Sequence, residues 1–171
     1  MIETLHYIGI VQALVMGVVL LSIRRNEKFE FKFLAILLLC LGLGILNETY
    51  GDYADVDYSL LFPFKFFFLI PNLVFLYVES KMVNSIPLKK IALNFLAGGI
   101  EFAVLCAILI LVKLKIINPD GDFLSYFDEF YTYLTVLYAV IIQVVILKKI
   151  AVYNGELFKY FSTIRYKYLN W

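Results

Sequence analysis

The stretch Ile91–Val112, IALNFLAGGIEFAVLCAILILV, decides the fold class because it is apolar almost throughout. About 20 such residues are needed for a helix to cross a bilayer. The run is apolar on all faces and does not alternate, which favours a helix over a barrel strand. Inside a bilayer no water is available to the backbone N–H and C=O groups, so they must bond to one another, as they do in a helix. Four similar runs bring the expected transmembrane helices to five: Leu5–Ile23, Phe33–Leu46, Leu60–Val78, Ile91–Val112 and Tyr133–Leu147.

The composition of the whole chain agrees with a membrane protein. Of its 171 residues, 63% are hydrophobic and 17% are charged. A soluble domain is about half apolar and about a quarter charged, and it needs a polar surface that this chain does not supply. We therefore expect an all-α membrane protein with five transmembrane helices over residues 5–147, followed by a basic, aromatic cytoplasmic tail at 148–171.

The charges in the connections predict the orientation. The connections at 47–59 and 118–132 are acidic and contain no lysine or arginine. Cytoplasmic loops carry an excess of lysine and arginine, so the positive-inside rule places the N-terminus outside and the C-terminus in the cytoplasm. Twelve of the 15 basic residues then lie on the cytoplasmic side: Arg24, Arg25, Lys28, Lys32, Lys81, Lys89, Lys90, Lys148, Lys149, Lys159, Arg165 and Lys167. The expected location is the bacterial inner membrane, with several passes.

Three residues form a candidate polar joint inside the membrane. Glu101 lies near the middle of its expected helix, and Asn72 lies at a comparable depth in the preceding one. Pro71 has no N–H to donate, so it frees the carbonyl of Phe67 and predicts a kink. A protonated Glu101 could donate to that carbonyl or to Asn72. Such a carboxyl is a functional candidate, although interhelical packing by a hydrogen bond is an equally ordinary role and the one we favour.

Lys65 is a candidate anchor at the outer boundary. It lies about 7.5 Å from the outer end of its expected helix at the helical rise per residue, within the reach of a lysine that extends its ammonium to the interface. The alternative is that Lys65 faces the bundle and pairs with an acidic outer-loop residue such as Glu48 or Asp52. Gly98 and Gly99, just before Glu101, indicate a close approach of two helices.

No pattern of catalytic or metal-binding residues is present in the sequence. It has one histidine and two well-separated cysteines, which offer no metal-ligand spacing, and it has no glycine-rich phosphate loop. We expect no enzyme activity and no cofactor. Nor does the chain have the basic surface of a nucleic-acid-binding protein.

Parts of the chain resemble the membrane domain of Bacteroidetes-type regulators. The resemblance lies in IGIVQALVMGVVLLSIRRNEK, FPFKFFFLIPNLVFLYVES and FSTIRYKYLNW. In that family several membrane helices precede a cytoplasmic output domain, often an AraC-type helix-turn-helix and sometimes a histidine kinase. The residues that match the family pattern are Pro71, Leu76, Tyr77, Val78, Ser162, Leu169 and Trp171.

The chain departs from that family because helices six and seven and the output domain are absent. The resemblance therefore implies a fragment of a regulator, namely its membrane sensory or anchoring domain. A small stand-alone membrane protein and a transporter component are the alternatives. The expected partners are the lipid bilayer, a cytoplasmic output domain or protein partner, and a second copy of the chain. No nucleic acid is expected to bind to this segment itself.

Overall fold

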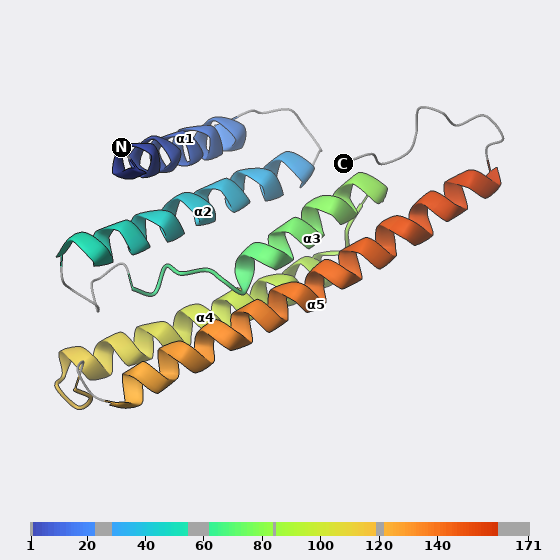
Figure 1. The fold of residues 1–171 in the computed structure, drawn as a ribbon. Helices are drawn as coiled ribbons and strands as arrows, with labels where there is room; N and C mark the ends of the chain where they lie inside the picture. The colour runs from blue at the N-terminus through green and yellow to red at the C-terminus, as the bar shows by residue number, and fades with distance from the viewer. Residues whose placement is uncertain (1, 23–28, 55–61, 84, 119–121, 161–171) are drawn as a thin grey trace.

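The computed structural model describes residues 2–22, 29–54, 62–83, 85–118 and 122–160, and within these ranges it contains helices and no strands. The predicted all-α class is confirmed for this part of the chain. Figure 1 shows the helices in chain order: α1 (Ile2–Ser22), α2 (Phe29–Ala54), α3 (Leu69–Met82), α4 (Leu88–Lys113) and α5 (Asp122–Tyr160).

Among the described residues, three segments are long enough and apolar enough to cross a bilayer: Phe31–Thr49, Leu88–Lys113 and Asp122–Glu156. The apolar segment Tyr7–Ser22 of α1 is shorter. Large apolar side chains also cover the outside of the molecule; on α4 and α5, Leu93 is 67% exposed and Val136 58%. Apolar surface on this scale is normal against lipid and abnormal against water. The number of spans and their orientation stay predictions.

The short helix α3 occupies the middle of the molecule. α1 packs on α2, α2 packs on α3, and α3 contacts both α4 and α5 (Figure 1). Leu73 and Leu76 of α3 are completely buried. α1 and α2 approach closely because Gly17 has no side chain: a Cβ there would lie 2.7 Å from Cγ of Leu39.

The third expected helix is shorter than the sequence predicts. We expected it to span residues 60–78, but α3 begins at Leu69 and residues 62–68 form turns. Pro71 is consequently the third residue of α3 and does not lie in a helix interior. The first four N–H groups of a helix have no partner within it, so a proline here breaks no hydrogen bond. The prediction of a proline kink is wrong for this reason.

The fifth helix is longer than the sequence predicts. Its expected span ended at Leu147, whereas α5 continues without interruption to Tyr160. The first part of the predicted tail is therefore a continuation of α5. The remainder, 161–171, lies outside the described residues, as do Ser162, Leu169 and Trp171 of the family resemblance.

Candidate functional site

The candidate site begins with the non-helical backbone before α3. Phe66 has a φ of 56°, in the left-handed region that bulky residues rarely adopt. Its carbonyl accepts hydrogen bonds from the amides of Leu69 and Ile70, at 3.1 and 3.0 Å, and so starts the helix. Non-helical backbone at membrane depth is tolerated only where its polar groups are satisfied within the protein. The amides of Phe67 and Phe68 therefore need acceptors.

Glu101 of α4 supplies those acceptors. Its Oε1 accepts from the amide of Phe67 at 2.8 Å and its Oε2 from the amide of Phe68 at 3.0 Å. The carboxyl group is buried, with Glu101 only 5% exposed. A carboxylate next to a helix N-terminus also interacts favourably with the helix dipole. We expected Glu101 to donate to the carbonyl of Phe67 or to Asn72; this is corrected, because the carboxyl oxygens face N–H groups and act as acceptors.

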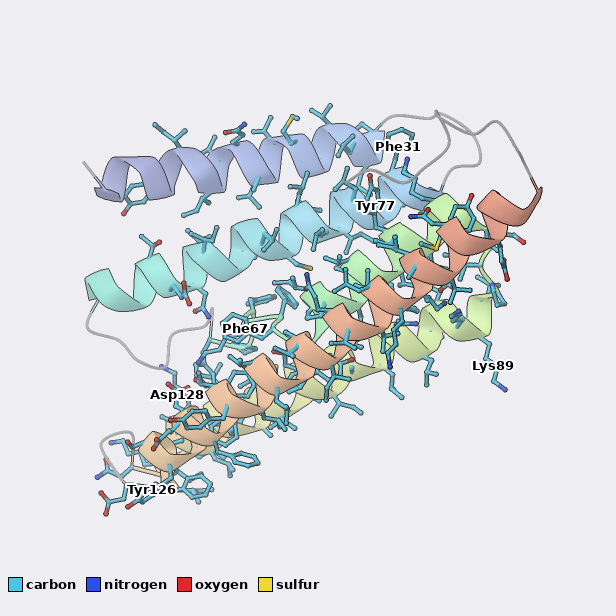
Figure 2. All side chains as sticks on the ribbon, turned by 45° about the vertical axis from the view of Figure 1, so that its right-hand side comes forward. Phe31, Phe67, Tyr77, Lys89, Tyr126 and Asp128 are labelled. Carbon is cyan, nitrogen blue, oxygen red and sulfur yellow. The ribbon has the colours of Figure 1, made fainter. Side chains whose placement is uncertain are left out.

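Tyr131 of α5 completes the surroundings of Glu101. Its hydroxyl donates to Oε1 of Glu101, and the residue is buried. Its ring stacks on Phe127, with centroids 5.9 Å apart, and lies 6.0 Å from the ring of Phe67. Figure 2 shows Phe67 in the interior of the molecule, between α2 and the α4–α5 pair. One carboxyl group thus connects the start of α3 to both neighbouring helices.

Asn72 forms a second polar centre one turn further along α3. Its Nδ2 donates to the carbonyls of Phe68 and Asn94, at 3.1 and 3.0 Å. Its Oδ1 accepts from the hydroxyl of Tyr138 at 2.9 Å. Asn72 and Glu101 are therefore close in the fold and both bond to the backbone of Phe68, but no hydrogen bond joins their side chains directly.

Lys65 lies beside the same cluster. Its ammonium pairs with Asp128 of α5 at 3.0 Å and lies 5.4 Å from the ring centroid of Tyr131. The lysine side chain is 20% exposed. The ammonium is held by Asp128 and by the rings of Phe62 and Tyr131, as in the alternative in which Lys65 faces the bundle; its position relative to the membrane interface stays a prediction. The alternative, a pairing with an acidic residue of the predicted outer connections, has a partner in Asp128; the side chain of Asp52 lies outside the described residues.

An apolar groove reaches this cluster from the outer surface of the helix pair. It lies between α4 and α5 and has a volume of about 380 Å³. Ile100 and Val104 line it from α4, Phe130 and Leu134 from α5, and Glu101 and Tyr131 are also among its lining residues. The hydrogen bond between Glu101 and Tyr131 is therefore reached through an apolar opening between α4 and α5.

A second charged centre lies where α3 ends, α4 begins and α5 passes both; we call this the basic end. Glu79 of α3 is 7% exposed, and its Oε1 accepts from the ammonium groups of Lys90 and Lys149, the latter at 2.8 Å. Burial alone would raise the pKa of Glu79, but the hydrogen bonds from Lys149 and Lys90 outweigh burial and lower this pKa below its ordinary value. The carboxylate therefore stays charged.

Sequence reasoning missed Tyr131, Tyr138 and Glu79. Tyr131 is one of the tyrosines that we expect at the outer membrane boundary, and Tyr138 was not identified, although their spacing of seven residues places them on one face of a helix. That spacing is the signal that could have indicated a shared role. Glu79 belongs to the basic connection ESKMVNSIPLKK and was not singled out. It is the one acidic residue in that connection, and this is the feature that could have indicated a special role.

The chemistry of the site is that of hydrogen bonding and charge pairing. No group of three or more histidine, cysteine or acidic residues that could hold a metal ion occurs among the described residues. Comparison with known proteins gave no match, since no family model, curated protein or solved structure is similar to the chain.

Proposed function

We propose that the chain is the membrane sensory domain of a bacterial signalling regulator. In this proposal five helices cross the inner membrane with the N-terminus outside, and the domain passes a change in helix packing to a cytoplasmic output domain. The family resemblance of the third segment motivates the class. The observation that supports the mechanism is that α5 is one continuous helix.

α5 joins the buried site to the cytoplasmic side as one helix. It contributes Tyr131 and Tyr138 to the two polar centres and runs without a break to Tyr160. Its 39 residues are roughly 58 Å long at the helical rise, compared with about 30 Å of hydrocarbon. A displacement of Tyr131 is therefore carried along a continuous helix to a point beyond the bilayer.

The switch in this proposal is the hydrogen bond between Glu101 and Tyr131. Breaking it removes the polar link between α5 and α4 beside the start of α3, while the amides of Phe67 and Phe68 still hold Glu101 against α3. A stimulus favours one packing when it binds that packing more tightly than the other. The groove between α4 and α5 offers such a stimulus access from the membrane.

Distance measurements between spin labels test the coupling. Labels are placed at Leu88→Cys on α4 and Val152→Cys on α5, both exposed positions, after Cys40 and Cys106 are replaced by alanine. We expect Tyr131→Phe to change the distance distribution. Tyr126→Phe is the matched control, because Tyr126 is 71% exposed and points away from the site at the start of α5 (Figure 2). The same distribution in Tyr131→Phe and in the parent would refute the coupling.

The regulator class is tested by the gene itself. An in-frame helix-turn-helix or kinase coding sequence downstream of residue 171 is expected. A stop codon at that point would contradict the regulator and favour a stand-alone membrane protein.

A further inference from the structure

The charged centre at the basic end has more positive charge than its own carboxylate neutralises. Glu79 carries one negative charge, and Lys90 and Lys149 carry two positive ones. Both ammonium groups bond to the same oxygen, Oε1, while Oε2 is buried without a hydrogen-bond partner in the described structure. One positive charge is therefore left over at a partly buried position.

The two lysines also have unused donors. A lysine ammonium has three N–H groups and accepts nothing. Each of these lysines donates one N–H group to Glu79, and neither has a second acceptor among the described residues. The side chains of Lys90 and Lys149 are each 36% exposed, so the remaining donors are accessible from outside.

The lysines are held in place, unlike ordinary surface lysines. Both ammonium groups lie near the ring of Phe75, at 5.6 Å for Lys90 and 4.7 Å for Lys149. Since both bond to one oxygen atom of a buried residue, they converge on one spot between α4 and α5. Two fixed cations with free donors form a preorganised site for an anion, because little side-chain freedom remains to be lost on binding.

The surroundings strengthen the positive potential. No side chain caps the amino end of α4, which begins directly after Pro87 and carries the positive end of a helix dipole. Among the described side chains at the basic ends of α3, α4 and α5, lysines outnumber glutamates: the lysines are Lys81, Lys89, Lys90, Lys148 and Lys149, and the glutamates are Glu79 and Glu156.

We propose that Lys90 and Lys149 bind the phosphate group of an anionic phospholipid of the cytoplasmic leaflet. Lys90 immediately precedes the expected span Ile91–Val112 and Lys149 follows Tyr133–Leu147 by two residues, so both lie at headgroup depth. Basic pockets between helices on the cytoplasmic side are suited to such headgroups. The site rests on the predicted orientation and does not require the signalling role.

Lipid titration followed by native mass spectrometry tests the site. The full chain in a neutral detergent is titrated with phosphatidylglycerol or with zwitterionic phosphatidylcholine, and the dissociation constant of the first bound lipid is measured. We expect the parent to prefer phosphatidylglycerol. Lys149→Gln and Lys90→Gln should each weaken its binding at least about fivefold, the effect of one basic residue near an anionic surface.

Lys89→Gln is the matched control. It removes the same charge from the neighbouring residue of α4, whose side chain extends away from the bundle (Figure 2), and it should leave the dissociation constant unchanged. An equal loss in Lys89→Gln and Lys149→Gln would overturn the proposal, because it would indicate general attraction to a basic surface.

Glu79→Gln separates lipid binding from folding. It keeps both ammonium groups and removes the competing carboxylate charge, so lipid affinity should be retained or increased even if the melting temperature falls. If Lys149→Gln lowers the melting temperature but leaves lipid affinity unchanged, the lysines serve only Glu79 and the proposal is refuted. Displacement of the lipid by inorganic phosphate at a similar concentration would assign the site to a soluble anion and refute the lipid ligand.

Discussion

The carboxyl group of Glu101 accepts a hydrogen bond from the hydroxyl of Tyr131 at the place where α3 begins. This relationship joins α4 to α5, and the apolar groove between these helices reaches it. The same carboxyl group accepts hydrogen bonds from the amides of Phe67 and Phe68, so a single residue connects all three helices. Removing it should therefore disturb more than one contact.

Replacing Glu101 distinguishes its role as an acceptor from its charge. Glu101→Ala leaves two amides and one hydroxyl without their acceptor, and each buried group left unpaired costs about 1–3 kcal/mol. Glu101→Gln keeps one acceptor oxygen and should destabilise the protein clearly less. Unfolding in mixed micelles, monitored by circular dichroism, measures the order. Equal destabilisation by the two variants would indicate that the negative charge, and not hydrogen-bond acceptance, is what matters.

Pro71→Ala should have little effect. Pro71 lies in the first turn of α3, where its missing N–H removes no helical hydrogen bond, so the cost is at most about 1 kcal/mol from greater freedom of the unfolded chain. The free energy of unfolding of the variant is compared with that of the parent. A loss of several kcal/mol would show that the proline has a structural role that this position does not explain.

Gly98 and Gly99 form a matched pair. A Cβ at Gly98 would lie 2.6 Å from Cβ of Leu69, whereas one at Gly99 would have nothing within 4 Å. Gly98→Ala should therefore cost about 1–3 kcal/mol through overpacking, and Gly99→Ala should be neutral or stabilising because alanine favours a helix. Thermal unfolding of both variants checks this. The reverse order would contradict the α3–α4 contact.

Glu79 makes the stability depend on pH. The hydrogen bonds from Lys149 and Lys90, acting against burial, lower the pKa of Glu79 below its ordinary value of 4.5. A carboxyl group with a depressed pKa contributes stability that is present above the unfolded value and lost as the pH falls through the folded value. Between about pH 6 and about pH 3, the melting temperature of the parent should thus fall further than that of Glu79→Gln. Parallel curves for the two proteins would refute this contribution.

The sequence predicts the apolar helices well because length and hydrophobicity alone determine them. It does not predict where α3 begins, because residues 62–68 are as apolar as the helix that follows. The break depends on Glu101, more than 30 residues away, which accepts the amides that the non-helical backbone exposes. A local pattern carries no information about such a distant acceptor.

The candidate site could be predicted in part. Glu101 and Asn72 were identified by their depth, and the structure brings both to the backbone of Phe68. Of the glycines, Gly98 is a close-approach residue as predicted and Gly99 is not. The partners on α5 were missed because tyrosine is common at membrane boundaries, so composition could not separate Tyr131 from the exposed Tyr126. Likewise, the charge of Lys65 did not reveal which acidic residue would face it.

The late start of α3 has a consequence for how the protein is made. α3 has 14 residues, roughly 21 Å of helix, which is too short to cross about 30 Å of hydrocarbon alone. The amides just before α3 need an acceptor, and leaving them unpaired in the bilayer costs free energy. Their acceptor is Glu101, which is synthesised later. We therefore expect the third segment to enter the bilayer only together with α4. In a glycosylation-mapping assay, a chain ending before Leu88 should leave this segment uninserted, whereas a chain ending after Lys113 should insert it.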